Sequence, residues 1–195
     1  MKNENPIEIF KTWLAEAQKS EINDPGAMAL ATATKDGKPS VRMVLLKSIG
    51  ERGFKFHTNS DSQKGREMLT NPYVSLCFHW KTLRKQVRVD GVIEEVSTSE
   101  ADEYFAGRPY NRQIGAWASD QSSPLDSRAA LEGRIEKFED QFKDQTIPRP
   151  PNWKGYIVRP QKIELWFDNP DRLHDRFVYE RDGDGPWLTG QRLYP

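Results

Sequence analysis

The sequence predicts a mainly β protein with flanking helices, built as a small β-barrel with three or four helices packed outside it. Two observations predict this class. Short strand-like segments recur along the chain with tight, glycine-containing turns between several of them, and only a few stretches carry the period of a helix. In addition, no unit of roughly 20–50 residues repeats, so solenoid and propeller folds are excluded.

The helical stretches are recognised by their apolar spacing and their caps. The first is "NPIEIFKTWLAEAQKSE", which "INDPGA" ends, and the longest is "SPLDSRAALEGRIEKFEDQFKDQ". That longest stretch has an apolar stripe of Leu131, Ile135, Phe138 and Phe142. A further helix is expected in "SDSQKGREMLTN" and another in "STSEADEYFAG". Their candidate N-caps are Ser60, Asp61 or Ser62 for the former, and Ser97 or Thr98 for the latter.

The strands are expected in two groups. The first comprises "AMALATAT", "PSVRMVLLKSI", "GFKFHTN", "YVSLCFHW" and "RKQVRVDGVIEEVST", in which Gly91 marks a bulge or bend. An extended connector, "TIPRPPNW", separates these from "GYIVRP", "KIELWF", "RFVYERD" and "GPWLTGQRLY". Four strands are too few to bury a core of their own, so residues 1–195 are expected to form a single domain.

The composition excludes several classes of protein. Lysine plus arginine and aspartate plus glutamate balance at 29 each, so no global field draws the chain to nucleic acid or to a membrane. No apolar run approaches the roughly 18–20 residues of a membrane span, and the N-terminus lacks a signal-peptide core. Cys77 is the single cysteine, lies among apolar residues and is expected to be a buried small hydrophobe. We therefore expect a cytoplasmic protein.

Familiar catalytic motifs are missing. The three histidines are scattered without ligand spacing, so no metal site is expected. The chain also lacks G-x-S-x-G, P-loop and G-x-G-x-x-G motifs, which removes the usual signs of a hydrolase, a nucleotide triphosphatase or a Rossmann protein.

Placed cations are the remaining candidates for chemistry. Arg42 and Lys47 bracket an apolar run, and strand parity puts them on opposite faces if that strand is straight. Lys64 stands at a probable helix start, where free backbone N–H groups favour an anion. Arg108 and Arg112 lie together in "YFAGRPYNRQIGAW". The alternative is that these cations form ordinary surface ion pairs, which contribute little.

The closing stretch "NPDRLHDRFVYERDGDGPWLTGQRLYP" keeps cations and aromatics to its last residue, although chain termini usually fray. On a strand, Arg172 and His174 point to the same face and Arg176 keeps that parity. "GPWLTGQRLYP" is expected to return as the partner strand. The sequence thus predicts one wall of a site here. The alternative is a surface hairpin in which Asp171 and Asp175 pair with these cations.

Several segments occur in a familiar order: "RMVLLK", "HTNSDSQK", "TLRKQVRV", "YFAGRPYNRQIGAWASDQSS", "IELWF" and "RLHDRFVYER", ending in "RLYP". Together they resemble the pyridoxine (pyridoxamine) 5′-phosphate oxidases, over nearly the whole chain. The resemblance implies an FMN-binding split β-barrel, with residues 154–195 completing the barrel and the active site. It also implies a homodimer that binds FMN between subunits, with no nucleic-acid or membrane partner.

The resemblance also implies roles for individual residues. The FMN site comprises Arg42, Met43, Val44, Leu45, Leu46, Lys47, His57, Thr58, Gln63, Lys64, Gln86, Gln121, Ser122, Trp166 and Arg176. The substrate site comprises Lys47, Tyr104, Arg108 and Arg112 around the phosphate, with Arg172 and His174 as the catalytic pair at the pyridine ring. Three positions depart from the pattern. Tyr-Thr is common at His57-Thr58, Ser-Arg-Lys at Ser62-Gln63-Lys64, and serine at Arg112.

The implied reaction oxidises pyridoxamine or pyridoxine 5′-phosphate to pyridoxal 5′-phosphate, a step of vitamin B6 metabolism. Dioxygen is the acceptor and hydrogen peroxide a product. Three alternatives stay open at this point: another split-barrel flavin reductase, a non-catalytic FMN or pyridoxal phosphate carrier, and a nucleic-acid binder suggested by the basic "RKQVRV" strand.

Overall fold

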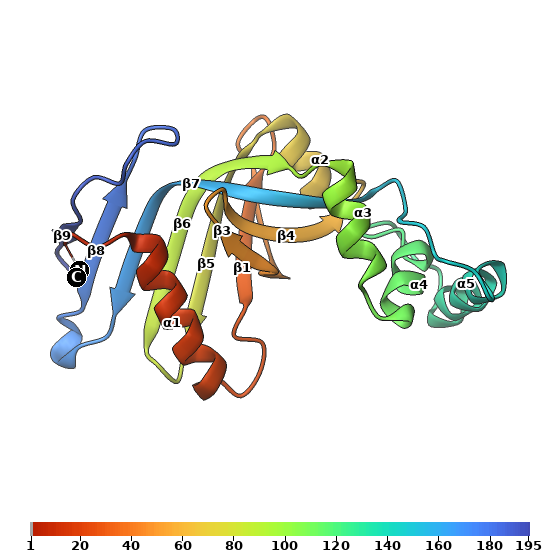
Figure 1. Ribbon diagram of the computed structural model, residues 1–195, viewed down its shortest axis with the longest axis horizontal. Coiled ribbons are helices and arrows are strands. Elements are labelled where there is room, and N and C mark those ends of the chain that lie inside the picture. Colours follow the sequence, from red (N-terminus) through yellow and green to blue (C-terminus); the bar gives the residue numbers. More distant parts are fainter. Residues whose placement is uncertain (1) are drawn as a thin grey trace.

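The computed structural model describes residues 2–195. The nine strands in these residues form one antiparallel sheet, in which seven strands follow the order β2-β1-β5-β6-β7-β4-β3 and β8 and β9 extend it beyond β7. The strands are β1 Ala27–Ala33, β2 Pro39–Leu45, β3 Ser48–Gly50, β4 Gly53–Asn59, β5 Tyr73–Trp80, β6 Lys85–Glu95, β7 Trp153–Phe167, β8 Asp175–Glu180 and β9 Gln191–Leu193. The sheet curls into an open half-barrel with flanking helices (Figure 1), which confirms the predicted fold class.

Five α-helices flank the sheet in the described chain, with one short 3₁₀ turn, η1. They are α1 Pro6–Ser20, α2 Gln63–Thr70, α3 Thr98–Ala106, α4 Tyr110–Ala118, α5 Arg128–Gln141 and η1 Pro170–Arg172. The hydroxyl of Ser62 accepts a hydrogen bond from the backbone N–H three residues further on and caps α2, and the hydroxyl of Ser97 caps α3 in the same way. Both serines were among the N-cap candidates predicted from the sequence. The sequence did not predict α4, and α1, at 15 residues, is longer than α5, at 14.

Helix α1 closes the inner face of the curled sheet. The side chain of Asn5 caps its N-terminus, and a proline follows at the first helical position. Phe10 is fully buried, with its ring 4.9 Å from that of Phe54 and 4.8 Å from that of Phe78. Strand β1 supplies alternate residues to the same core, because its side chains point in and out with a period of two.

Strand β7 links the two ends of the molecule. The sequence predicted two strands, "GYIVRP" and "KIELWF", but these residues form one strand of 15 residues that pairs with β4, β6 and β8. The pairing with β6 shifts register at Asp90/Gly91, as expected for Gly91. A Cβ on Gly91 would lie 2.2 Å from the carbonyl oxygen of Arg159, so the close approach requires glycine.

The predicted strand "PSVRMVLLKSI" is divided. Strand β2 ends at Leu45 and β3 begins at Ser48, so Lys47 lies in the connection and donates its backbone N–H to the carbonyl of Lys55 at 2.8 Å. The parity argument for Arg42 and Lys47 therefore fails, because the two residues do not share one straight strand.

The closing stretch also differs from the prediction. Arg172 ends η1 and has a left-handed backbone with φ 62°, and β8 begins only at Asp175. Arg172 and His174 are thus in a loop, and strand parity does not orient them. The partner strand β9 is present but spans only Gln191–Leu193, pairing Leu193 with Arg176. The surface-hairpin alternative paired Asp175 with the neighbouring cations. In the structure Asp175 instead forms an ion pair with Arg192.

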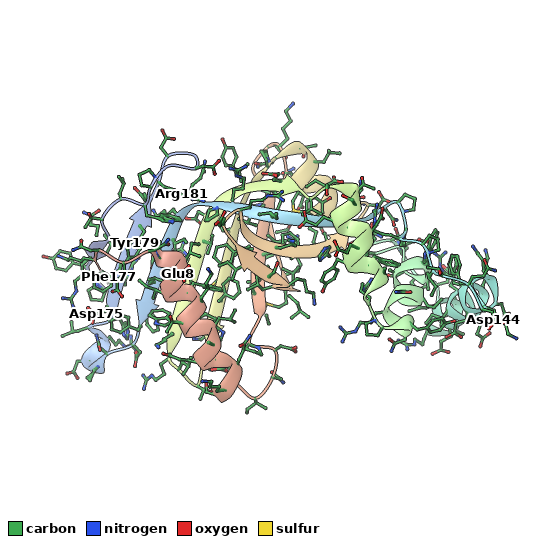
Figure 2. All side chains as sticks on the ribbon, in the orientation of Figure 1. Glu8, Asp144, Asp175, Phe177, Tyr179 and Arg181 are labelled. Carbon is green, nitrogen blue, oxygen red and sulfur yellow. The ribbon has the colours of Figure 1, made fainter. Side chains whose placement is uncertain are left out.

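Strand β8 and helix α5 stand at opposite ends of the molecule's long axis (Figure 1). Figure 2 labels Asp175, Phe177, Tyr179 and Arg181 along and just beyond β8 at one end, and Asp144, just after α5, at the other. The helices α3, α4 and α5 enclose a second, smaller core around Phe105. Between residues 2 and 195, no helix has both the length and the apolar character needed to cross a bilayer.

Candidate active site

Two adjoining cavities lie where β2 and β4 meet α3 and α4. The smaller has a volume of about 530 Å³ and the larger about 890 Å³. Both are lined by Lys47, His57, Arg108, Arg112 and Trp153. Most of the residues predicted for the phosphate of the substrate and for one side of the flavin therefore come together. Another cavity, of about 610 Å³, lies between the N-terminal segment and residues 181–189 and contains none of the predicted residues.

The smaller cavity is cationic. Lys47, Arg108 and Arg112 line it, and in the described chain none of the three is paired with a carboxylate within 4.0 Å. Burial, and then the charges of Arg112 and Arg108, lower the pKa of Lys47. Burial likewise lowers the pKa of Arg108. Glu100 and Glu103 also line this cavity, but Glu100 pairs with Lys55 and Arg52. A cluster of three cations without a close ion pair favours an anionic ligand.

Arg108 is the most telling of these cations. Its guanidinium carbon lies 4.7 Å from the ring centroid of Trp153 and 5.4 Å from that of Phe105. Its Nη1 is buried and has no hydrogen-bond partner. A buried guanidinium nitrogen without an acceptor is costly, so this nitrogen is suited to donate to a ligand that supplies one.

His57 is the centre of an aromatic stack that forms the wall between the cavities. Its ring lies 4.1 Å from that of Tyr104 and 4.6 Å from that of Trp153, with interplanar angles of 15° and 7°. Both ring nitrogens are buried without a hydrogen-bond partner. Burial, followed by the charges of Lys55 and Lys47, lowers the pKa of His57 to about 4, so the ring is neutral at pH 7. It acts here as a flat aromatic surface.

The larger cavity has a buried ammonium at the start of α2. Lys64 donates from Nζ to Gln121 Oε1 at 2.8 Å, Thr58 Oγ1 at 3.2 Å and Ser62 Oγ at 3.3 Å. All three acceptors are neutral. Burial, and then the charge of Arg42, lower the pKa of Lys64 to about 8. A buried ammonium held by neutral groups is suited to bind a phosphate.

Arg42 faces a buried carboxylate that the sequence analysis missed. Its guanidinium donates to the hydroxyls of Thr32 and Ser40 and lies 3.4 Å from Glu67 Oε2. Burial opposes ionisation, but hydrogen bonds from two hydroxyls and an amide, with the Arg42 charge, lower the pKa of Glu67 to about 2. The amide belongs to Gln63, which donates to Glu67 Oε1 at 2.9 Å. Arg42 therefore carries its own counter-ion, and Lys64 does not.

Three of the four residues between Arg42 and Lys47 line the larger cavity. They are Met43 and Leu45, which are 62% and 40% exposed, and Val44, which also packs against the main core. Leu46 packs against the main core and does not line the cavity. Gln121 and Ser122 line the same cavity, and Tyr104 lines the smaller one. Cavity residues that the sequence analysis did not identify include Lys55, Asn59, Glu100, Glu103, Asn111, Ser119 and Trp153.

The rest of the predicted site lies elsewhere on the chain. Gln86, Trp166 and Arg176 are directly paired across β6, β7 and β8, so they form one row of the sheet. Arg176 donates to both carboxylate oxygens of Glu164 at 3.1 Å and to the carbonyl of Tyr194 at 3.0 Å. Arg172 and His174 line a separate cavity of about 350 Å³ nearby.

The two groups lie in different places within one chain: residues of the first line the two adjoining cavities, and Arg172 and His174 line another. Trp153, in the first group, begins β7, and Trp166, in the second, stands near its other end. That length of strand corresponds to roughly 40 Å at about 3.3 Å per residue. A complete site with all predicted residues therefore requires two copies of the chain.

The curled antiparallel half-barrel places the chain in the split-barrel class of proteins. A structure of a pyridoxamine 5′-phosphate oxidase-related, FMN binding protein from Nostoc punctiforme supports this fold, with a TM-score of 0.78, 16% identity, and coverage of 99% of this chain and 100% of that one. The structure of PhzG from Burkholderia lata 383, in complex with tetrahydrophenazine-1-carboxylic acid, has a TM-score of 0.91 at 37% identity, covering 98% and 93%.

Sequence comparisons identify the family. Residues 14–142 match the family model described as pyridoxamine 5′-phosphate oxidase, and residues 153–195 match the pyridoxine 5′-phosphate oxidase C-terminal dimerisation region. A pyridoxine/pyridoxamine 5′-phosphate oxidase of Gluconobacter oxydans is 56% identical over 191 residues, 98% of this chain and 94% of that protein. One from Rhizobium meliloti is 55% identical, covering 97% and 92%. The chain belongs to the pyridoxamine 5′-phosphate oxidase family.

Proposed function

We propose that this protein is an FMN-dependent oxidase that converts pyridoxamine and pyridoxine 5′-phosphate to pyridoxal 5′-phosphate with dioxygen as acceptor. The observation that carries the proposal is the pair of adjoining cavities, one with three cations that lack counter-ions and the other with the buried Lys64 ammonium. Both ligands of such an enzyme carry a phosphate, and each phosphate has a cationic cavity to enter. The enzyme family supports the same reaction.

The residues of the larger cavity fit FMN. Lys64 and the start of α2 suit its phosphate, and the stacked rings beside the exposed residues of β2 suit a flat, largely apolar ring system. When bound, FMN supplies the two-electron acceptor, which dioxygen reoxidises to give hydrogen peroxide. Oxidising the amine substrate also consumes water and releases ammonia, whereas the alcohol does neither.

The protein's own residues mainly bind and orient the substrate. Lys47, Arg108 and Arg112 hold the phosphate, remote from the carbon that is oxidised. Arg172 and His174 stand at the pyridine ring in our proposal. Placement of a ring and an acceptor in contact accounts for several kcal/mol of a barrier, about 7–11 in well-oriented intramolecular reactions.

A homodimer completes the site. The row of Gln86, Trp166 and Arg176, with Arg172 and His174 beside it, would face the cavities of a second copy. Trp166, Arg172, His174 and Arg176 all lie within residues 153–195, which match the dimerisation region, and Gln86 lies on β6. We further propose that residues 1–195 act as one domain and that the enzyme works in the cytoplasm.

The known structure of PhzG with a tricyclic carboxylic acid raises a second candidate, oxidation of a phenazine precursor. The three cations of the smaller cavity favour the phosphorylated substrate instead, because a single carboxylate would leave most of that charge unmatched. Turnover of each substrate by one preparation, followed as oxygen uptake, decides between them.

The cofactor prediction is tested on the purified protein. We expect a yellow dimer that releases FMN into the supernatant on acid or heat treatment, because the cavity holds FMN by hydrogen bonds and charge alone. Absorbance of the released flavin gives the stoichiometry, with one FMN per chain expected. A colourless protein that takes up no FMN at micromolar concentration contradicts the proposed function.

Gln63→Arg is expected to tighten FMN binding up to about tenfold, since one charged hydrogen bond contributes roughly 1.5–3 kcal/mol. Glu67 moderates the gain, because its Oε1 is 2.9 Å from the Gln63 amide and would pair with the new guanidinium. Titration of the apoprotein followed by flavin fluorescence measures the effect. Gln63→Met is the matched control and should weaken binding or leave it unchanged. Weaker binding by Gln63→Arg itself would refute the prediction.

A further inference from the structure

The turn between α3 and α4 is held by one side-chain amide. Residues 107–109 form this turn, and Gln113 lies one helical turn into α4. Its Nε2 donates to the carbonyls of Phe105 at 3.1 Å, Ala106 at 3.1 Å and Arg108 at 3.0 Å. The last carbonyls of a helix have no partner within that helix, so Gln113 closes the end of α3 from the neighbouring helix.

The surroundings determine which end of the amide points at the turn. All three neighbours are carbonyl oxygens, which only accept, so the NH₂ group of Gln113 and not its oxygen must face them. An amide nitrogen carries two hydrogens, so one of them is shared between two of the carbonyls. Glutamine does not titrate, and these bonds therefore do not depend on a protonation state.

Arg108 is fixed along most of its length. Its backbone N–H donates to the carbonyl of Phe105 at 3.1 Å, and its carbonyl accepts from Gln113. Its guanidinium carbon lies over the rings of Trp153, at 4.7 Å, and Phe105, at 5.4 Å. The buried Nη1 has no partner in the described chain, and Arg108 lines both cavities. The side chain is thus in place before a ligand binds.

We propose that Gln113 is a positioning residue for the phosphate site: it holds the α3–α4 turn so that the guanidinium of Arg108 stands in place before the substrate arrives. The proposal rests on the proposed function, in which Arg108 holds the phosphate of the substrate. Gln113 itself lines neither cavity, so it acts only through the turn. Ordering a long side chain costs binding free energy, and a turn that is fixed in advance removes part of that cost.

Steady-state oxygen uptake tests the proposal with Gln113→Met, which keeps the length of the side chain and removes its donor. We expect the KM for pyridoxamine 5′-phosphate to rise roughly three- to tenfold, the loss that corresponds to one net hydrogen bond. The kcat should stay within about twofold, and kcat/KM for pyridoxamine without its phosphate should change as little. A merely structural role would lower the turnover of both substrates alike.

Two further variants guard against an effect of methionine itself. Gln113→Glu keeps the shape of the side chain but presents oxygens to the three carbonyls, so KM should rise at least as much as in Gln113→Met. Gln145→Met is the matched control. Gln145 also donates to a carbonyl at the end of a helix, that of Gln141 in α5, and it lies outside both cavities. This control should behave as the wild type.

A double-mutant cycle decides whether Gln113 acts through Arg108. If the amide only places the guanidinium, adding Gln113→Met to Arg108→Met should change KM by less than about twofold. Two independent effects would instead multiply.

The outcomes separate the two proposals. A KM within about twofold of the wild type in both Gln113 variants, an equal loss on both substrates, or multiplying effects in the cycle would overturn the role of Gln113. A wild-type holoenzyme that does not oxidise pyridoxamine 5′-phosphate instead contradicts the proposed function. In that event, binding of inorganic phosphate to the wild type and to Gln113→Met, followed by ³¹P magnetic resonance, still tests Gln113. Weaker binding by the variant supports its role, and equal affinities overturn it.

Discussion

Replacing Arg108 by methionine is expected to raise the KM for pyridoxamine 5′-phosphate about 10- to 150-fold, with a much smaller change in kcat. The loss of one charged hydrogen bond corresponds to roughly 1.5–3 kcal/mol, which gives this range. The effect falls on binding because Arg108 lies in the cavity with Lys47 and Arg112, where it has a buried Nη1 without a partner. Methionine keeps the apolar stem that packs over Trp153, which alanine would remove.

Steady-state oxygen uptake with two substrates measures this prediction. Pyridoxamine without its phosphate should be a poor substrate of the wild type and should lose little further in the variant. Arg128→Met is the matched control, since Arg128 is exposed on α5 and pairs only with Glu132 one helical turn away. An equal loss on both substrates would mean that Arg108 acts on the fold, and a fall in kcat alone would place the phosphate elsewhere.

Local patterns in the sequence were enough for most of the fold. The strand β1, the caps Ser62 and Ser97 and the bulge at Gly91 are each determined within a few residues, and each is confirmed. Local patterns failed where tertiary contacts determine the bounds of a strand or helix. Pro160 suggested a strand end, yet β7 runs through it because the register shift opposite Gly91 accommodates the proline. Helix α4 was missed because no side chain caps its N-terminus.

The site divides in the same way. The cations Lys47, Lys64, Arg108 and Arg112 were expected from their neighbours in the sequence, and the structure brings them to the two cavities. The stack of His57 on Trp153 joins β4 to the start of β7, and the pairing of Arg42 with Glu67 joins β2 to α2. Contacts between segments so distant in sequence leave no local pattern.

The loop before β8 shows the limit of parity. Arg172 and His174 were oriented on the assumption of an extended strand, whereas left-handed residues at Asp171 and Arg172 turn the chain there. Neither residue is glycine, so the sequence offered no sign of that conformation. Their roles at the substrate stay predictions.

The affinity of the apoprotein for FMN is expected to fall steeply above pH 8. The pKa of Lys64 is lowered to about 8, mainly by burial, so its ammonium is lost from the free protein above that pH. The phosphate of FMN keeps its second negative charge there, because its pKa is about 6. Only the charged lysine attracts that dianion. We therefore expect a nearly constant Kd between pH 7 and 8 and a rise approaching about tenfold per pH unit above it.

The stability of the apoprotein should change in the opposite direction. The unfolded chain keeps the ordinary pKa of 10.5, so between about pH 8 and 10.5 it binds a proton at Lys64 that the folded protein does not. The contribution of this group to the free energy of unfolding therefore rises with pH across that window. FMN affinity and apoprotein stability thus diverge, which a general loss of structure at high pH would not produce.

Lys64→Met isolates the lysine. The variant should bind FMN about 10- to 150-fold more weakly at pH 7, by the same allowance for one charged hydrogen bond, and should lose the steep dependence above pH 8. Its apoprotein should be as stable as the wild type or more so, because it no longer buries an ammonium among Thr58, Ser62 and Gln121. Fluorescence titrations from pH 7 to 10 and urea unfolding of the apoproteins supply both quantities. A variant that keeps the wild-type pH dependence would assign the titration to another group and remove Lys64 from the phosphate site.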